Sequence, residues 1–181
     1  MRKAAEHPWN VALALSDVPE TGRRIALVAD APVRAALAKL AGLRDLPRLE
    51  AAFDVSLHGH GGLRVCGHVR ATVGQTCVVT LDPVENELDE PVDVTFTPAA
   101  AAVAAAHGGT GVESADDKAP EPLVDGVIDL GAIATEFLLL GIDPYPRKPG
   151  AVFQAPPTGP VTAHPFAALA ALKKGPAGKG G

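Results

Sequence analysis

The sequence is poor in aromatic side chains and in sulfur. Phenylalanine, tryptophan and tyrosine make up 4% of the 181 residues, and there is a single methionine. Any core must therefore be built from aliphatic side chains and alanine. Two cysteines, Cys66 and Cys77, cannot form a framework of several disulfides, and the chain does not open with a signal-peptide pattern. We expect reduced thiols and a cytoplasmic protein.

A net positive charge and long apolar runs are also missing. The formal charge is −5, which disfavours a strongly basic nucleic-acid-binding protein. No apolar run approaches the roughly 20 residues that a membrane-spanning helix needs, so we expect no membrane partner. The charge is unevenly spread, with +3 over residues 1–81, −13 over 82–143 and +5 over 144–181. A basic tail therefore follows an acidic middle, and it could dock there or on an acidic partner.

Alternating apolar and polar residues predict an antiparallel sheet. The clearest alternation covers residues 48–57 and 63–73, and the glycine-rich stretch 59–62 between them predicts a hairpin turn. Strands are also expected over three further segments, 9–15, 24–29 and 84–97, of which the last alternates less cleanly. In the last segment Pro91 indicates either an edge strand or a break.

Two segments carry helix signals. Asp30 is placed as an N-cap with Pro32 in the first turn, and Gly42 can end that helix. Asp129 can cap a second helix, which ends before Pro144 and covers one face of the sheet. The predicted fold class is α+β, an antiparallel β-sheet meander with one or two covering helices, a mobile insertion and an extended C-terminal tail.

Composition divides the chain into one domain and a tail. Residues 1–150 are predicted to form a single α+β domain, interrupted near 98–126 by a low-complexity insertion that we expect to be mobile. Residues 151–181 form a proline-rich basic tail, and a short helix is expected there from Pro165 onward.

Motifs for catalysis or cofactor binding are scarce. The candidate metal ligands, whose spacing does not fit a zinc ribbon, are His58, His60, Cys66, His68 and Cys77. Surface histidines and a small buried hydrophobic Cys77 explain them more simply. Phosphate-binding glycine loops are absent from the sequence. We predict a protein that is not an enzyme and uses no metal, cofactor or small-molecule substrate; a metal- or cysteine-dependent enzyme is the alternative.

The residues with most binding potential lie near the C-terminus. Three prolines between Asp143 and Gly150 stiffen the backbone around Tyr145 and two cations, an arrangement suited to a base, a phosphate or an acidic patch. Alternatively, Tyr145 folds back onto the domain and the cations neutralise the acidic middle. The predicted contact residues for RNA or protein are Tyr145, Arg147, Lys148, Phe166, Leu169, Lys173 and Lys174.

Several of these segments together resemble a known family. Residues Val65–Val84, Ile128–Gly131, Asp143–Gly150 and Pro165–Lys174 are similar, in this order, to the YceD family of large ribosomal RNA subunit accumulation proteins. The resemblance implies a non-enzymatic role in the synthesis, processing or stability of large-subunit (23S) ribosomal RNA. Many members carry Cys-x-x-Cys where this chain has Cys77-Val-Val-Thr80, so Thr80 replaces the second cysteine.

The expected function is therefore that of a ribosome-assembly factor. Its expected partner is large-subunit ribosomal RNA or a large-subunit ribosomal protein. Because phosphate contacts dominate nucleic-acid affinity, the acidic charge favours a role mediated by protein. A further alternative is a purely protein-binding adaptor whose acidic strand face, Glu85 to Asp93, grips a basic ribosomal protein.

Overall fold

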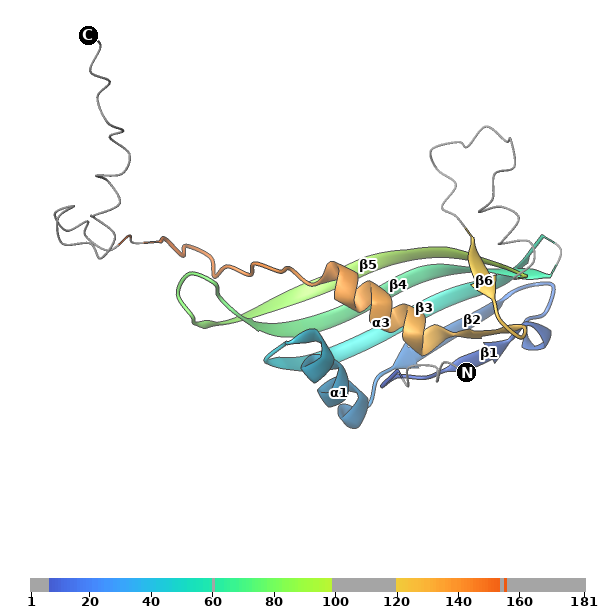
Figure 1. The fold of residues 1–181 in the computed structure, drawn as a ribbon, viewed down its shortest axis with the longest axis horizontal. Helices are drawn as coiled ribbons and strands as arrows, with labels where there is room; N and C mark the ends of the chain where they lie inside the picture. Colours follow the sequence, from blue (N-terminus) through green and yellow to red (C-terminus); the bar gives the residue numbers. More distant parts are fainter. Residues whose placement is uncertain (1–6, 60, 99–119, 154, 156–181) are drawn as a thin grey trace, which may run out of the picture. The chain divides into compact units, whose positions relative to one another are not determined.

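The computed structural model describes residues 7–59, 61–98, 120–153 and 155 (Figure 1). The chain divides into two units, residues 1–149 and 150–181, and all described helices and strands belong to the first. The split of the chain into a domain ending at residue 150 and a tail with a short helix stays a prediction, because the residues of the expected helix lie outside the described ranges.

A five-stranded sheet is the centre of the first unit. Its strands follow the order β2 (Arg23–Val28), β3 (Asp45–His58), β4 (Gly62–Thr76), β5 (Pro83–Pro98) and β6 (Glu121–Leu123). The pairs from β2 to β5 are antiparallel and form the predicted meander, whereas β6 runs parallel to β5. The α+β class is confirmed, with a sheet that is mixed at this one edge.

The alternation of apolar residues in β3 and β4 sets which face of the sheet is buried. Leu49, Phe53 and Val55 point into the core, with the Phe53 side chain fully buried, whereas their sequence neighbours Arg48 and Asp54 are exposed. In a strand, successive side chains point to opposite faces, so one strand supplies both a core and a solvent surface. The predicted hairpin between β3 and β4 is confirmed by their antiparallel register.

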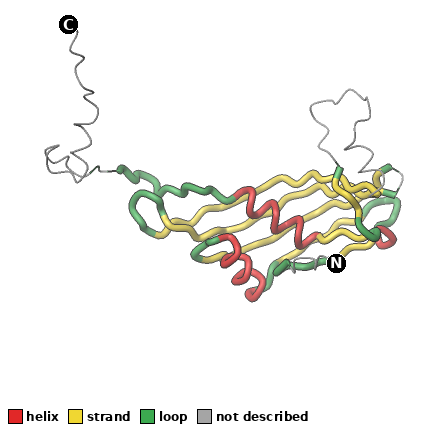
Figure 2. Tube along the Cα trace, viewed as in Figure 1, coloured by secondary structure: helices red, strands yellow, loops and turns green. Residues whose placement is uncertain are grey.

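A helical layer covers the core face of the sheet (Figure 2). Helix α3 (Leu130–Gly141) packs on β4 and β5, and its Leu138 is fully buried. Helix α1 (Ala31–Ala41) packs on β3. As predicted, Asp30 caps α1 by accepting a hydrogen bond from the Val33 N–H at 2.9 Å, and Gly42 ends it in the left-handed conformation.

The N-terminal strand joins this layer through a second, two-stranded sheet. Strand β1 (Ala12–Ala14) pairs antiparallel with β7 (Val127–Asp129), immediately before α3. The Asp129 carboxylate accepts hydrogen bonds from Gly131 and Ala132 at the start of α3 and from the Val11 N–H at 2.8 Å. One side chain therefore caps the helix, as predicted, and also holds the start of β1 against it.

Two details differ from the sequence-based expectations, and of the two alternatives for Pro91 the edge strand is the one observed. The strand expected over residues 9–15 is limited to β1, and a short 3-10 helix (Leu15–Asp17) follows it. Within the expected insertion 98–126, residues Glu121–Leu123 form β6, because pairing with the end of β5 satisfies their backbone; residues 99–119 lie outside the described ranges. Pro91 does not break β5, which runs unbroken along the edge of the sheet before β6 begins.

The opposite face of the sheet carries a set of cross-strand ion pairs. Arginines of β3 and β4 face acids of β5: Arg48 pairs with Glu87, Arg64 with Asp93 and Arg70 with Asp89, each at 2.9 Å. His68 also contacts Asp89, at 2.7 Å. Hydrogen bonds from His68 first and Arg70 second lower the pKa of Asp89 below its ordinary value.

Candidate partner-binding site

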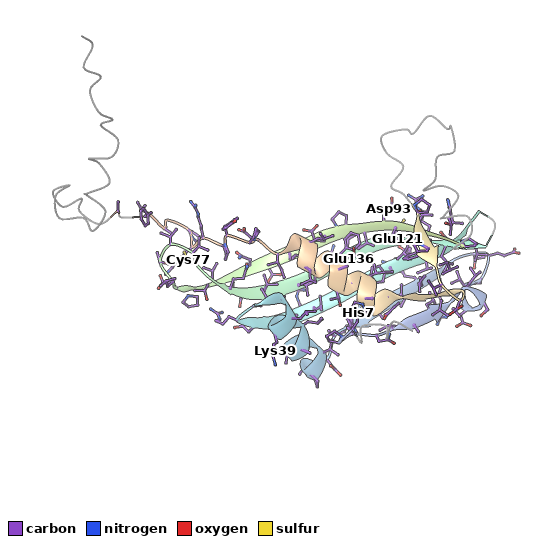
Figure 3. All side chains as sticks on the ribbon, viewed as in Figure 1. His7, Lys39, Cys77, Asp93, Glu121 and Glu136 are labelled. Carbon is purple, nitrogen blue, oxygen red and sulfur yellow. The ribbon has the colours of Figure 1, made fainter. Side chains whose placement is uncertain are left out.

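A tight loop between β4 and β5, Cys77 to Asp82, forms the first part of the candidate site. The loop is closed by hydrogen bonds from the Cys77 N–H to the Asp82 carbonyl at 2.8 Å and from the Leu81 N–H to the Cys77 carbonyl at 3.0 Å. Leu81 adopts a left-handed backbone conformation and is 77% exposed. Cys77 lies at the end of the sheet opposite Glu121 of β6 (Figure 3).

The sulfur of Cys77 organises this loop. Its side chain is fully buried, and its Sγ accepts hydrogen bonds from the N–H groups of Val79 and Thr80 at 3.4 Å and of Lys148 at 3.3 Å. The Lys148 N–H, followed by the Thr80 hydroxyl and N–H, lowers the pKa of the Cys77 thiol to about 6. The prediction of a buried Cys77 is confirmed, and its sulfur is in addition a hydrogen-bond acceptor for three backbone N–H groups.

Residues 143–149, which we call the platform, are fixed on this loop by contacts of both backbone and side chains. The Val78 N–H donates to the Pro146 carbonyl at 2.9 Å, and the Gln75 side-chain amide donates to the Asp143 carbonyl at 2.8 Å. Lys148 Nζ contacts the Asp82 carboxylate at 3.0 Å. The platform is therefore held at several points to a strand end and loop that are 66 to 71 residues away in sequence.

Each of the two predicted alternatives holds for some residues of the platform. Tyr145 is 70% exposed and Arg147 is exposed, as the recognition alternative requires. Lys148 instead neutralises Asp82, and its ammonium group lowers the pKa of that carboxyl below the ordinary value. Arg147 has no ion pair within the described part of the chain. The platform therefore presents one aromatic ring and one uncompensated cation.

Four further contact residues were predicted from the sequence, all in the segment 156–181. Phe166, Leu169, Lys173 and Lys174 lie outside the described residues. The loop itself exposes two apolar side chains, Val78 and Leu81, which were not predicted as contact residues. Their exposure follows from the loop conformation, and periodicity carries no signal for it because the strand pattern ends at Thr76.

The described candidate metal ligands are dispersed, and His60 lies outside the described residues. Cys66 and His68 lie on the ion-pair face of β4 but bind separate acids: the Cys66 thiol donates to Asp93 at 3.4 Å and His68 contacts Asp89. Burial, followed by the Asp93 carboxylate, raises the pKa of the Cys66 thiol. Across the described ranges, no group of three or more His, Cys, Asp or Glu side chains is placed to hold a metal ion.

The acidic strand face is largely neutralised within the protein. Glu87 contacts Arg48 and accepts a hydrogen bond from the Thr72 hydroxyl at 2.7 Å, and the Thr72 hydroxyl is the main cause of the lowered pKa of Glu87. Asp89 and Asp93 are also paired with arginines of β4. This face therefore has less free negative charge for a basic partner than its sequence suggests.

Comparison with known families identifies the chain. The family model described as large ribosomal RNA subunit accumulation protein YceD matches residues 65–173, more than half of the sequence. The chain belongs to the YceD family. Comparisons with curated proteins and with solved structures gave no match.

The YceD match includes both parts of the candidate site. It covers the Cys77–Asp82 loop and the platform, as well as most of β4 and all of β5 and α3, whereas β1, β2, α1 and β3 precede it. The family resemblance implies that many YceD proteins carry a second cysteine at the position of Thr80. In this chain, Thr80 donates hydrogen bonds to the Cys77 sulfur. Among the described helices, none is long and apolar enough to cross a lipid bilayer.

Proposed function

We propose that this YceD protein promotes the accumulation of large-subunit (23S) ribosomal RNA as a non-enzymatic assembly factor. In this proposal it binds ribosomal RNA or a large-subunit ribosomal protein through the platform and the Cys77–Asp82 loop. Membership of the YceD family supports the link to large-subunit RNA. The protein performs no chemistry on its partner, uses no cofactor and acts in the cytoplasm.

The observation that carries the proposal is an exposed aromatic ring on a fixed backbone. Tyr145 is preceded and followed by prolines, its N–H is bonded to the Asp143 carboxylate at 2.8 Å, and the buried Pro146 is bonded to Val78. A side chain that is already positioned loses less conformational entropy on binding. A tyrosine with 70% of its surface exposed at such a position is suited to stack on an unpaired base or to pack on a protein surface.

The charges of the platform indicate that Arg147 makes the partner contact that weakens as salt concentration rises. Lys148 is held by Asp82, whereas Arg147 is exposed and has no ion pair with a described residue. A guanidinium can bind a phosphate or carboxylate through two parallel hydrogen bonds. Arg147 is therefore assigned to partner binding and Lys148 to positioning of the platform.

The proposal is tested with the full-length variants Tyr145→Ala and Arg147→Ala. Both side chains are exposed, so each variant is expected to keep the unfolding midpoint of the original protein. The protein is recovered from cell extract with and without ribonuclease, and bound ribosomal RNA, bound ribosomal proteins and cellular 23S RNA are measured. Each variant is expected to lose at least half of the bound partner. Lys39→Ala, which removes an exposed cation from α1, is the matched control.

The two outcomes of the nuclease arm identify the partner. If bound RNA disappears with nuclease and no ribosomal protein remains, the partner is RNA. If a ribosomal protein remains, that protein is the partner. Unchanged recovery of both and unchanged 23S RNA in the two platform variants would show that the platform is not the binding site.

A further inference from the structure

Strand β2 leaves one edge of the five-stranded sheet open. The sheet order places β2 at the end next to β3, and no second strand pairs with β2 among the described residues. Ala26 and Val28 are exposed, and 72% of the Val28 surface is accessible. An open strand edge is a template for pairing with another strand.

The register identifies which backbone groups face the open edge. The Ala29 N–H donates to the Leu49 carbonyl at 3.0 Å, which continues the register that pairs Leu27 with Ala51 and Ile25 with Phe53. In an antiparallel pair, alternate residues bond to the same neighbour. Ile25 and Leu27 therefore bond to β3, and the N–H and C=O groups of Arg24, Ala26 and Val28 point away from the sheet.

The other long edge of the sheet is protected along its length, whereas β2 carries charge only at its start, on Arg23 and Arg24. Strand β5 carries Pro91 and several acidic residues along its edge, and β6 covers its last residues. Proline and charge are the usual devices that prevent edge-to-edge pairing. Between Ile25 and Val28, β2 contains neither proline nor a charged residue. This contrast indicates that pairing at β2 is tolerated by the protein.

We propose that the β2 edge is a dimer interface, in which the β2 strands of two copies of this chain pair antiparallel about Ala26. Ala26 of each copy then lies opposite Ala26 of the other, and Arg24 lies opposite Val28. This register is self-complementary: the three free N–H groups of each copy meet the three free carbonyls of the other. Both copies use the same surface, as a two-fold symmetric interface requires.

The side chains around β2 agree with this register. Ile25 would lie opposite Leu27 of the second copy on the core face, where both are half-buried and apolar. On the ion-pair face, Val28 lies opposite Glu50 of β3, and no ion pair of Glu50 occurs in the described part of the chain. Arg24 of the second copy, which contacts its own Asp54 at 3.9 Å, would lie beside the exposed Val28, two strand spacings or roughly 10 Å from Glu50. The interface is small, so the dimer is expected to depend on concentration.

Sedimentation equilibrium of the full chain tests the proposal. The average mass is expected to rise from that of one chain toward that of two as concentration increases. Ala26→Pro removes the central N–H of the edge, and Val28→Lys places a cation opposite Arg24 of the second copy. Both variants are expected to stay monomeric at concentrations where the original protein is dimeric. Leu40→Lys, on the exposed side of α1, makes the same kind of change away from the edge and is expected to dimerise normally.

A disulfide cross-link tests the register. Directly opposed residues that exchange hydrogen bonds have Cα atoms about 5.5 Å apart, within the range that a disulfide spans. Ala26→Cys is therefore expected to form a covalent dimer on oxidation, in excess of the original protein and of Leu40→Cys. A monomer at every concentration, a dimer unaffected by Ala26→Pro with folding intact by circular dichroism, or binding of β2 to a strand of another protein alone would each overturn the proposal.

Discussion

Replacement of Asp129 by alanine should expose how strongly one carboxylate stabilises the N-terminal part of the fold. Its Oδ1 accepts three backbone hydrogen bonds, from Val11 at 2.8 Å, Gly131 at 3.0 Å and Ala132 at 3.1 Å. Loss of a helix cap costs about 1 kcal/mol, and loss of a charged acceptor for a part-buried N–H costs about 2 kcal/mol more. We expect Asp129→Ala to lower the free energy of unfolding by about 3 kcal/mol.

Asp129→Asn separates the acceptor geometry from the charge. The asparagine amide oxygen can occupy the Oδ1 position and keep all three bonds, whereas its NH2 group loses the bond that Oδ2 accepts from the Asn10 side-chain amide at 2.6 Å, so the expected loss is about 1 kcal/mol. At this chain length 1 kcal/mol corresponds to roughly 2–4 °C in melting temperature, which gives roughly 6–12 °C for Asp129→Ala. Both values are measured by calorimetry and urea unfolding, with the exposed Asp17→Ala as control. Equal destabilisation by asparagine and alanine would refute the reasoning from acceptor geometry.

Three further predictions concern the core and the Cys77 loop. Gly131→Ala should prevent folding or lower stability severely, because a Cβ there would overlap the Trp9 carbonyl, and far-UV circular dichroism checks this. Leu138→Ala should cost about 2–5 kcal/mol in urea unfolding, because its fully buried side chain would leave a cavity. The lowered pKa of Cys77 stabilises the folded state in full above the ordinary thiol pKa of 9.0, and this contribution is lost as pH falls toward about 6. The difference in unfolding free energy between the original protein and Cys77→Ala should therefore shrink as pH falls over that window.

The sequence predicts the parts of this fold whose signals are local. The alternation in β3 and β4 identifies their buried faces because the side-chain period of a strand is two. Asp30 and Asp129 mark helix starts because their carboxylates bond N–H groups two or three residues ahead. By contrast, the pairing of Ala12 with Asp129 and of Phe96 with Glu121 depends on segments that are distant in sequence, and short strands carry little pattern of their own.

The candidate site also combines features that local sequence predicts with features that depend on distant residues. A proline-flanked Tyr145 and adjacent cations could be selected from the sequence because their spacing stiffens the backbone. The different roles of Arg147 and Lys148 could not be predicted, because they depend on Asp82 lying within reach of one and not the other. Likewise, the lowered pKa of the Cys77 thiol depends on an N–H from Lys148, which only the folded chain brings to the sulfur.

The position of β1 has a consequence for the order of folding. Val11 bonds to Asp129, 118 residues later, so the first strand of the chain cannot complete its contacts until nearly the whole domain has been synthesised. The hairpins from β2 to β5 involve shorter loops and can close earlier. During synthesis the N-terminal segment therefore has no pairing partner until β7 and the start of α3 have been made. In refolding followed by hydrogen exchange, amides of β3 and β4 should gain protection before that of Leu13.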